Sequence, residues 1–289
     1  MTLLQIATTG VLQGLIYALI GLGLYLIFNV MRVVNFAHGY FVLIGMYGVL
    51  SLSPRSLADF AVALLFVAAV AAAFGYFVER FLIESTLDKT GHAQLVITLS
   101  VGVALQYIFQ VLYPEPYQTI TNPWPMEAIT ALGVTISFAR LAAGAVSLLL
   151  AVALSWLIYR TRLGVYMRAC AESINGAMFV GVNVRRVYRS TFALGAAAAA
   201  VAGGLLIPFQ PVSPLYGLEL TVKAFIVVVI GGSGALWGTV AAGILLGVAE
   251  AASSVYISGS LGSSVIYTLF LLVILFRPQG LARRTVASA

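Results

Sequence analysis

Long apolar runs without a single Asp, Glu, Lys or Arg constrain this chain more than any other feature. An α-helix needs about 20 predominantly apolar residues to cross a bilayer. The runs that approach or exceed this length are 1–31, 33–54, 60–78, 93–114, 141–159, 190–218, 224–249 and 251–276. Charged residues make up only 8% of the sequence, whereas soluble domains carry about 25%. The sequence therefore predicts an all-α fold, a polytopic transmembrane helical bundle.

Other classes of protein do not fit these runs. Strands of an outer-membrane β-barrel alternate apolar and polar residues, and the runs are continuous. The first run does not resemble a cleavable signal peptide, because it lacks a basic start and exceeds the usual apolar length of about 7–15 residues. Cys170 is the only cysteine, which excludes an intramolecular disulfide and a cysteine-rich metal site.

Residues 160–190 form an arginine-rich island between two apolar runs. Six arginines and one glutamate give the island a formal charge of +5, against +6 for the whole chain. Loops rich in Lys and Arg between membrane spans face the cytoplasm. We expect the C-terminal segment at 277–284, with three more arginines, on the same side. Counting spans backwards places residues 79–92 inside and the N-terminus outside. Residues 114–139, with four prolines and no Lys or Arg, are expected to be an external loop with a small amount of structure.

Two interruptions divide the apolar runs. Gly-Gly-Ser-Gly at 231–234 lies within one run, and a glycine in a helix interior costs about 1 kcal/mol relative to alanine. We therefore expect about seven full spans plus a broken or re-entrant helix pair at 218–231 and 235–251. Polar residues and a glycine at 29–39 mark the second interruption. One break in each half suggests an internal two-fold repeat, and in transporters such breaks often frame the substrate path.

Four segments, in order along nearly the whole chain, resemble the signatures of branched-chain amino acid ABC-importer permeases. They are Val-Asn-Phe-Ala-His-Gly at 34–39, Arg-Ala-Cys-Ala-Glu at 168–172 leading to Gly-Val-Asn at 181–183, Val-Ile-Gly-Gly-Ser-Gly at 229–234 with Trp-Gly at 237–238, and Leu-Phe-Arg-Pro-Gln-Gly-Leu at 275–281. The resemblance is to the smaller of the two paired permease subunits. The glycine segment alone also resembles the related sugar permeases, from which the segment at 34–39 separates the amino acid branch.

The resemblance implies partners in a bacterial inner membrane. A homologous second permease would complete a heterodimeric pore, two cytoplasmic ATPase subunits would drive it, and a periplasmic substrate-binding protein would deliver the solute. ATP and Mg would bind to the ATPases, and this chain would carry no cofactor and no catalytic residue. The sequence has no Gly-rich motif ending in Gly-Lys-Ser/Thr, the signature of ATP-binding loops. The lipid bilayer is the other partner, and the basic balance reflects loop topology rather than nucleic-acid binding.

Within a single integral membrane permease domain of residues 1–289, the island at 160–190 matches the family's coupling loop. A short helix at about 169–180 would insert into a groove on the ATPase and end at Gly181. The arginines at its far end, up to Arg189, would meet lipid headgroups or acidic residues of the ATPase. The candidate coupling residues are Arg168, Ala169, Ala171, Glu172, Gly181, Asn183, Arg185 and Arg186. The alternative is a plain basic loop without a partner.

Polar groups near the two interruptions are candidates for the translocation path. They are Asn35, His38, Glu219, Lys223, Gly231, Gly232, Ser233 and Gly234. For His38, we prefer the alternative that it satisfies backbone groups at the break. Glu219 and Lys223 are spaced i, i+4 and can pair on a helix face, and ionisable groups in a membrane mark function by default. The alternative puts Glu219 at the outer surface with Lys223 extending to the interface. We expect Glu250 to end a helix at the interface.

Three functions compete for such a chain. The first is a permease subunit of an ATP-driven importer, moving leucine, isoleucine, valine or a similar small polar solute by alternating access. The second is a stand-alone secondary transporter or a channel for a small amide such as urea. Proton coupling favours carboxylates buried in mid-span, and Glu219 is the nearest candidate. The third, an intramembrane enzyme, lacks a metal-spaced cluster of His and Cys.

Overall fold

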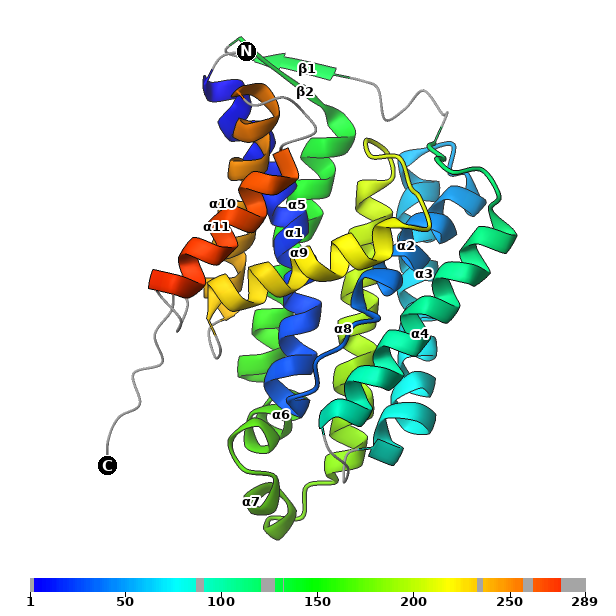
Figure 1. Cartoon of the computed structure of the whole chain (residues 1–289), viewed down its shortest axis with the longest axis vertical. Helices are drawn as coiled ribbons and strands as arrows, with labels where there is room; N and C mark the ends of the chain where they lie inside the picture. Colours follow the sequence, from blue (N-terminus) through cyan, green and yellow to red (C-terminus); the bar gives the residue numbers. More distant parts are fainter. Residues whose placement is uncertain are drawn as a thin grey trace.

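The computed structural model describes residues 3–86, 91–120, 128–131, 133–232, 236–256 and 262–276 (Figure 1). The helices are α1 (Leu3–Met31), α2 (His38–Leu52), α3 (Leu57–Val78), α4 (Gly91–Leu112), α5 (Phe138–Arg160), α6 (Arg162–Glu172), α7 (Ile174–Phe179), α8 (Val184–Leu206), α9 (Tyr216–Gly231), α10 (Leu236–Tyr256) and α11 (Gly262–Phe276). A π-helical turn, η1 (Glu79–Ile83), and a 3-10 turn, η2 (Glu84–Thr86), continue α3. Strands β1 (Ala128–Ala131) and β2 (Val134–Ser137) form an antiparallel hairpin with Ala128 opposite Ser137.

Six helices within the described residues are long and apolar enough to cross a membrane. They are α1, α3 with its η1 and η2 extension, α4, α5, α8 and α10. The prediction of an all-α polytopic bundle is confirmed. The count of about seven full spans differs. α10, predicted as half of a re-entrant pair, is long enough to cross a membrane, whereas the run at 251–276 forms the 15-residue α11. The run at 33–54 forms the 15-residue α2. At a rise of 1.5 Å per residue this helix covers about 22 Å, less than the hydrocarbon core of about 30 Å.

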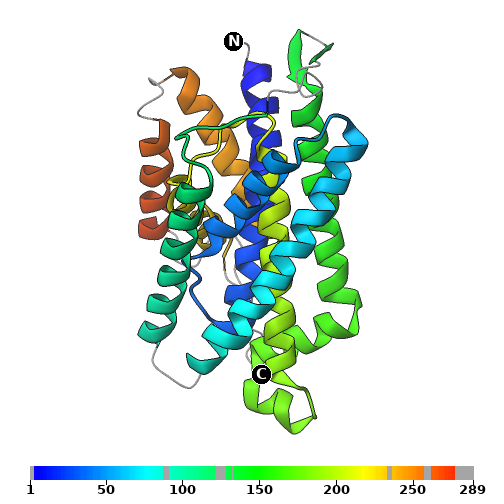
Figure 2. The same ribbon diagram turned by 90° about the vertical axis from the view of Figure 1, so that its right-hand side faces the viewer.

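The island and the hairpin lie at opposite ends of the molecule (Figures 1 and 2). One end carries α6, α7 and the start of α8, and the other carries the start of α1 with β1 and β2. Ion pairs join Arg189 of α8 to Glu84 of η2, so the end of α3 lies with the island. The structure thus places residues 79–86 at the end of the island and the start of α1 at the opposite end, and which end faces the cytoplasm stays a prediction. The hairpin is the expected small structure at 114–139, and the arginines at 277–284 lie outside the described residues.

Local sequence explains where the helices begin. Ser56 precedes α3, and its hydroxyl accepts the Asp59 N–H at 3.2 Å, while the Asp59 carboxylate accepts the Ser56 N–H at 3.1 Å. This reciprocal pair is a capping box, which satisfies two backbone donors at the helix start. Thr161 and Ser173 similarly accept N–H groups at the starts of α6 and α7.

The packing of the two halves follows an approximate two-fold pattern. α1 packs against α10 as α8 packs against α3, α1 and α8 contact each other, and so do α2 and α9. α1 runs from the hairpin end towards the island, and α8 runs the opposite way (Figure 1). Pairing α1–α2–α3 with α8–α9–α10 therefore makes an inverted repeat, a common plan in transporters. The repeat was expected, but the structure matches the interruption before α2 to residues 207–215 before α9, not to the glycines at 231–234.

Small residues allow the central helices to approach at backbone distance. Gly10 and Gly14 of α1 face α10, and a methyl group added to Gly14 would lie 2.5 Å from the Ile244 Cα atom. Gly243 and Gly247 of α10 face α1 in the same way. Between apolar helices in lipid there is no hydrophobic driving force, so close van der Waals packing of small residues holds them together. Large apolar side chains such as Leu65 and Leu149 point outward, as a lipid-facing surface requires.

Candidate functional site

The connection between α1 and α2 is an unwound segment buried inside the bundle. Asn35 and His38 are fully buried. The Asn35 side-chain oxygen accepts the Ala37 N–H at 3.0 Å, and His38 Nε2 donates to the Ile20 carbonyl oxygen at 2.9 Å. His38 therefore satisfies a backbone carbonyl, as interpreted, but this carbonyl lies inside α1 rather than at the break. Non-helical backbone at membrane depth persists because such partners replace water.

This connection is held against α9 and α4. The Gly39 N–H donates to the Thr221 hydroxyl at 2.8 Å, and that hydroxyl lies 3.2 Å from the Phe36 carbonyl oxygen. Tyr40 donates its hydroxyl to the Gln106 side-chain oxygen of α4 at 2.9 Å. Sequence reasoning missed Thr221, because a threonine within an apolar run carries no signal of its own.

The predicted glycine break lies between α9 and α10. α9 ends at Gly231, and Gly232 has φ of 87°, a left-handed conformation that glycine adopts at no steric cost. A methyl group on Gly231 would lie 2.6 Å from the Thr239 Cα atom, so the two helices meet closely here. Ser233 and Gly234 lie outside the described residues.

Glu219 and Glu250 form an ion cluster around the buried Lys223 between α9 and α10. Lys223 Nζ lies 2.9 Å from Glu250 Oε1 and 3.1 Å from Glu219 Oε1, and the Lys223 side chain is 5% exposed. It also donates to the Tyr17 hydroxyl of α1 at 3.4 Å. The predicted i, i+4 pair is confirmed, and Lys223 does not extend to an interface. The expectation that Glu250 ends a helix is wrong, since α10 continues to Tyr256 and packing turns the carboxylate towards Lys223.

The ion cluster lines a pocket of about 450 Å³. The pocket also contains Gln13 and Tyr17 of α1, Arg140 of α5 and the connection between α8 and α9 at 209–211. Gln13 donates to the Tyr17 hydroxyl at 3.0 Å, and the Arg140 guanidinium lies 4.9 Å from the centre of the Phe209 ring. Asn35 and His38 do not line it, so the two groups of path candidates are separate. Arg140 was missed, although an arginine at the start of an apolar run was visible in the sequence.

The island folds as two short helices. The single helix predicted at 169–180 is wrong, because Ser173 is extended between α6 and α7 and its hydroxyl accepts the Gly176 N–H at 3.1 Å. The role of Gly181 in ending α7 is confirmed. Its φ is 81°, its N–H donates to the Met178 carbonyl, and the Val182 N–H donates to the Ala177 carbonyl. These two bonds are those of a Schellman motif, which commonly ends helices at glycine.

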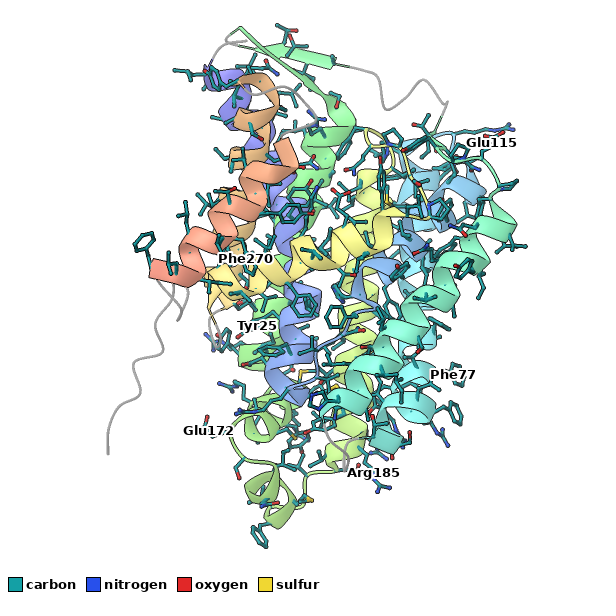
Figure 3. The ribbon with its side chains drawn as sticks, in the orientation of Figure 1. Tyr25, Phe77, Glu115, Glu172, Arg185 and Phe270 are labelled. Atoms are coloured by element: carbon teal, nitrogen blue, oxygen red, sulfur yellow. The ribbon has the colours of Figure 1, made fainter. Side chains whose placement is uncertain are left out.

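The candidate coupling residues on α6 lie beside a small pocket at the island end. Arg168 and Glu172 line this space of about 240 Å³ with the end of α1, and the Arg168 guanidinium lies 5.6 Å from the centre of the Tyr159 ring. Glu172 lies near this end in Figure 3. Ala169 is half-buried, and the buried Ala171 accepts from Arg32 Nη2 through its carbonyl at 3.3 Å. The island is thereby joined to the α1–α2 connection.

The tip of the island presents apolar side chains. Phe179 is 90% exposed and Val180 is 77% exposed at the end of α7. Ile174 and Met178 of the same helix are also exposed. An exposed apolar patch rimmed by polar residues is typical of an interaction surface.

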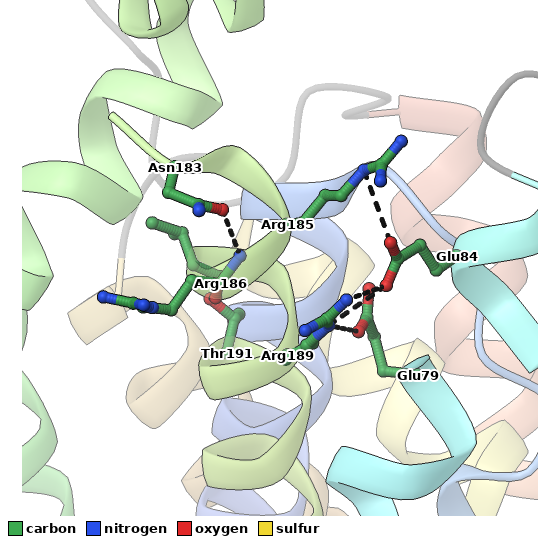
Figure 4. A network of polar contacts seen from close by, with 8 residues as sticks. Glu79, Glu84, Asn183, Arg185, Arg186, Arg189 and Thr191 are labelled. Atoms are coloured by element: carbon green, nitrogen blue, oxygen red, sulfur yellow. Dashed lines mark hydrogen bonds and ion pairs between the residues drawn. The ribbon is translucent and has the colours of Figure 1, made fainter. Parts of the chain in front are cut away.

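The arginines at the start of α8 have partners within this chain (Figure 4). Arg189 Nη2 lies 2.6 Å from Glu84 Oε2, and Arg185 Nε lies 3.3 Å from Glu84 Oε1. Arg189 Nε also lies 3.7 Å from the fully buried Glu79. The sequence did not reveal these partners, and the Arg185 side chain is still 73% exposed, so contact of Arg185 and Arg189 with lipid headgroups or ATPase residues stays a prediction. Arg186 is exposed.

Asn183 begins α8. Its side-chain oxygen accepts the Arg186 N–H at 3.0 Å, the usual arrangement of an N-cap residue. Its position in the island is therefore explained by helix capping, and contact with a partner stays a prediction.

Comparison with known proteins identifies relatives of nearly the same length. A family model described as the permease component of the branched-chain amino acid transport system matches residues 6–275. The high-affinity branched-chain amino acid transport system permease protein BraD of Pseudomonas aeruginosa is 31% identical over 298 residues, covering 97% of this chain and 96% of the relative. The corresponding protein LivH of Escherichia coli K12 is 32% identical over 296 residues, with the same coverage. No solved structure matches the chain.

Proposed function

Because this chain belongs to the family of permease components of branched-chain amino acid transport systems, we propose that it is a pore-forming subunit of an ATP-driven importer. It moves leucine, isoleucine, valine or a similar small polar solute across the bacterial inner membrane by alternating access. The observation that carries this proposal is the similarity to named transport permeases over 97% of the chain. The multi-pass architecture with six long apolar helices among the described residues supports it.

The island is the part of the molecule that receives force from the ATPases. Its α7 tip projects from the bundle (Figure 1) and carries exposed Phe179 and Val180. Exposed apolar side chains at the end of a basic segment are suited to bind in a groove on a cytoplasmic partner. ATP and Mg bind to two such ATPase subunits, and this chain supplies no catalytic residue.

The remaining partners follow from the same assignment. A homologous second permease completes the pore, and a periplasmic binding protein delivers solute to the hairpin end. The basic island faces the cytoplasm, and the start of α1 lies at the opposite end (Figure 1), so the N-terminus is periplasmic. The three arginines at 277–284 assign the C-terminus to the cytoplasm by the same rule. A stand-alone secondary transporter or urea channel is not favoured, since the relatives are named as permease proteins of transport systems.

Affinity purification of the tagged chain in mild detergent from its own cells, followed by mass spectrometry, tests the proposal. We expect a second permease and ATPase subunits to be recovered with it. Deletion of 173–180 or Glu172→Lys is expected to remove the ATPases and abolish uptake, while the second permease and membrane insertion are retained. Glu115→Gln, at the opposite end in Figure 3, is the control and should change nothing. Recovery of the chain alone, or as a homo-oligomer without ATPase, would refute the proposal.

A further inference from the structure

The 450 Å³ pocket lies between α1, α5, α9 and α10. Two of its charged side chains each have a buried polar atom that the described residues leave unpaired. Glu250 Oε2 and Arg140 Nε are both buried without a hydrogen-bond partner in the described part of the chain. A buried charged group that lacks a partner is costly. A ligand that brings a donor to Glu250 and an acceptor to Arg140 would satisfy both.

The pocket holds two cations, Lys223 and Arg140, and two carboxylates, Glu219 and Glu250. Lys223 is bound to Glu219 and to Oε1 of Glu250, which leaves the second Glu250 oxygen available. Arg140 has no ion pair among the described residues and lies over the Phe209 ring. Tyr17, whose hydroxyl accepts from Lys223 at 3.4 Å, lines the same pocket as Glu250 and Arg140. The pocket is therefore formally neutral, but it presents both cationic and anionic side chains to a ligand.

We propose that this pocket binds the zwitterionic main-chain groups of an α-amino acid, with Glu250 accepting from the ammonium group and Arg140 donating to the carboxylate. This inference rests on the proposed transport function and names the part of the solute that is recognised. Guanidinium groups match carboxylates in geometry and charge. The zwitterion has no net charge but two charged ends, and these match a formally neutral pocket that contains both cationic and anionic side chains. Urea and short amides carry no charge, so they would leave Arg140 without a counter-ion and Glu250 Oε2 without a charged donor.

The pocket has room for an aliphatic side chain beside the charged groups. Its volume of about 450 Å³ falls in the usual range of about 300–1,000 Å³ for ligand sites. Phe209, Pro211, Gly247 and Ala251 supply apolar lining. Gly247 contributes backbone alone because α10 packs closely on α1 there. The site therefore fixes the main-chain groups by charge and accepts side chains by shape.

The pocket is built at the hairpin end of the molecule. Gln13 and Tyr17 lie in the first half of α1, Arg140 is in the first turn of α5, and Glu250 is in the last third of α10. This end lies opposite the island (Figure 1). A solute that enters from the side opposite the ATPases would therefore meet the pocket before it reaches the buried connection between α1 and α2.

Binding of tritiated L-leucine to the purified full chain, together with any partners that copurify, tests the proposal. The competitors are 4-methylpentanoate, which lacks the ammonium group, 3-methylbutylamine, which lacks the carboxylate, and urea. Each truncated analogue is expected to bind at least about tenfold more weakly than leucine, because it loses a charge-assisted hydrogen bond. Urea should not compete. This series uses the wild-type protein and does not depend on the folding of a variant.

Two variants assign the ends of the ligand. Glu250→Gln should weaken leucine binding about tenfold or more and remove the preference for leucine over 4-methylpentanoate. Arg140→Gln should remove the preference for leucine over 3-methylbutylamine. A merely structural role would weaken all ligands alike. The matched controls are Glu115→Gln and Arg55→Gln, whose side chains are exposed outside the pocket, and these should bind like the wild type.

The outcomes separate this inference from the proposed function. If the wild type binds no leucine, or if both variants keep the preference of the wild type for leucine over its analogues, the pocket does not bind the zwitterion. The importer assignment would still stand if ATPases copurify. If leucine binds as expected but no ATPase is recovered, the importer assignment fails and the site remains.

Discussion

At the scale of the residue, Lys223 shows how a membrane bundle tolerates a buried charge. It is 5% exposed and contacts two carboxylates. Removing one member of a buried ion pair leaves the other charge uncompensated, which is costlier than replacing the whole pair. The cluster therefore behaves as a unit, and its members should be tested together.

Lys223→Met is expected to lower the free energy of unfolding by about 3 kcal/mol, because Glu250 and Glu219 lose their counter-ion. The double variant Lys223→Met/Glu250→Gln should regain part of this loss. Thermal unfolding in detergent, followed as the midpoint temperature, measures both. A double variant no more stable than the single one would contradict the view of the cluster as an ion pair.

Cys170 illustrates a residue whose chemistry is set by burial. It is buried on α6, and burial raises the pKa of its thiol. The thiolate is the reactive form of cysteine. At pH 7 to 8, a smaller fraction of Cys170 is thiolate than of an exposed cysteine with the ordinary pKa of about 8.5. The reactivity should rise only as the pH increases through the raised pKa.

N-ethylmaleimide is expected to modify native Cys170 at least about tenfold more slowly than an exposed cysteine. The reference is Phe179→Cys in a Cys170→Ser background, since Phe179 is exposed at the end of α7. Mass spectrometry of timed samples gives the two rates. The difference should vanish in denaturant, and equal rates in the folded protein would show that Cys170 is accessible.

At the scale of the element, the two interruptions of the helices have different physical causes. α9 stops at Gly231 because Gly232 takes a left-handed conformation, and α10 then starts in a new direction. The α1–α2 connection relies instead on Asn35, His38 and Thr221 as hydrogen-bonding partners. One break is therefore set by backbone conformation and the other by buried polar side chains.

Gly232→Leu is expected to block uptake. At φ of 87° a side chain is strained, and leucine favours continuing the helix across the break. Radiolabelled leucine uptake into cells measures the effect, with immunoblotting of membranes to confirm insertion. Val229→Leu, half-buried on α9, is the matched control and should transport normally. Wild-type uptake by Gly232→Leu would show that the break has no role in transport.

At the scale of the whole molecule, the two halves are held by close backbone contact. α1 lies against α10 through Gly10, Gly14, Gly243 and Gly247. The pocket of Lys223 is built across this contact, since Tyr17 belongs to α1 and Glu250 to α10. The separation of these helices therefore sets the geometry of the proposed binding site.

Gly14→Leu is expected to separate α1 from α10, because even a methyl group there would lie 2.5 Å from the Ile244 Cα atom. Overpacking of this kind costs about 1–3 kcal/mol or more, visible as a lower unfolding midpoint in detergent. Leucine binding should weaken as well. Val11→Leu, on an exposed position of α1, is the control, and an equally mild effect of both substitutions would contradict this packing.

The chain by itself determined the features that depend on local composition. Charge-free runs indicate helices in lipid, arginines in the island indicate its side, and glycines at 231–232 and 181 mark where helices end. The predictions of helices and of helix ends hold because hydropathy and backbone freedom act within one turn or one span. The bounds within the island differ from the prediction at Ser173, because its side chain caps α7 and competes with the tendency to continue α6.

Only the tertiary structure decided which charged groups on different helices meet. Glu84 reaches Arg189 across 105 positions, and Lys223 reaches Glu250 across 27. Arg140 enters the pocket from α5, which no spacing along the chain reveals. Such pairings depend on which helices pack together, and in a uniformly apolar membrane bundle that choice is made by small residues and a few polar contacts between distant segments. The island's arginines therefore predict the side that it faces, but not the carboxylates that Arg185 and Arg189 contact within the chain.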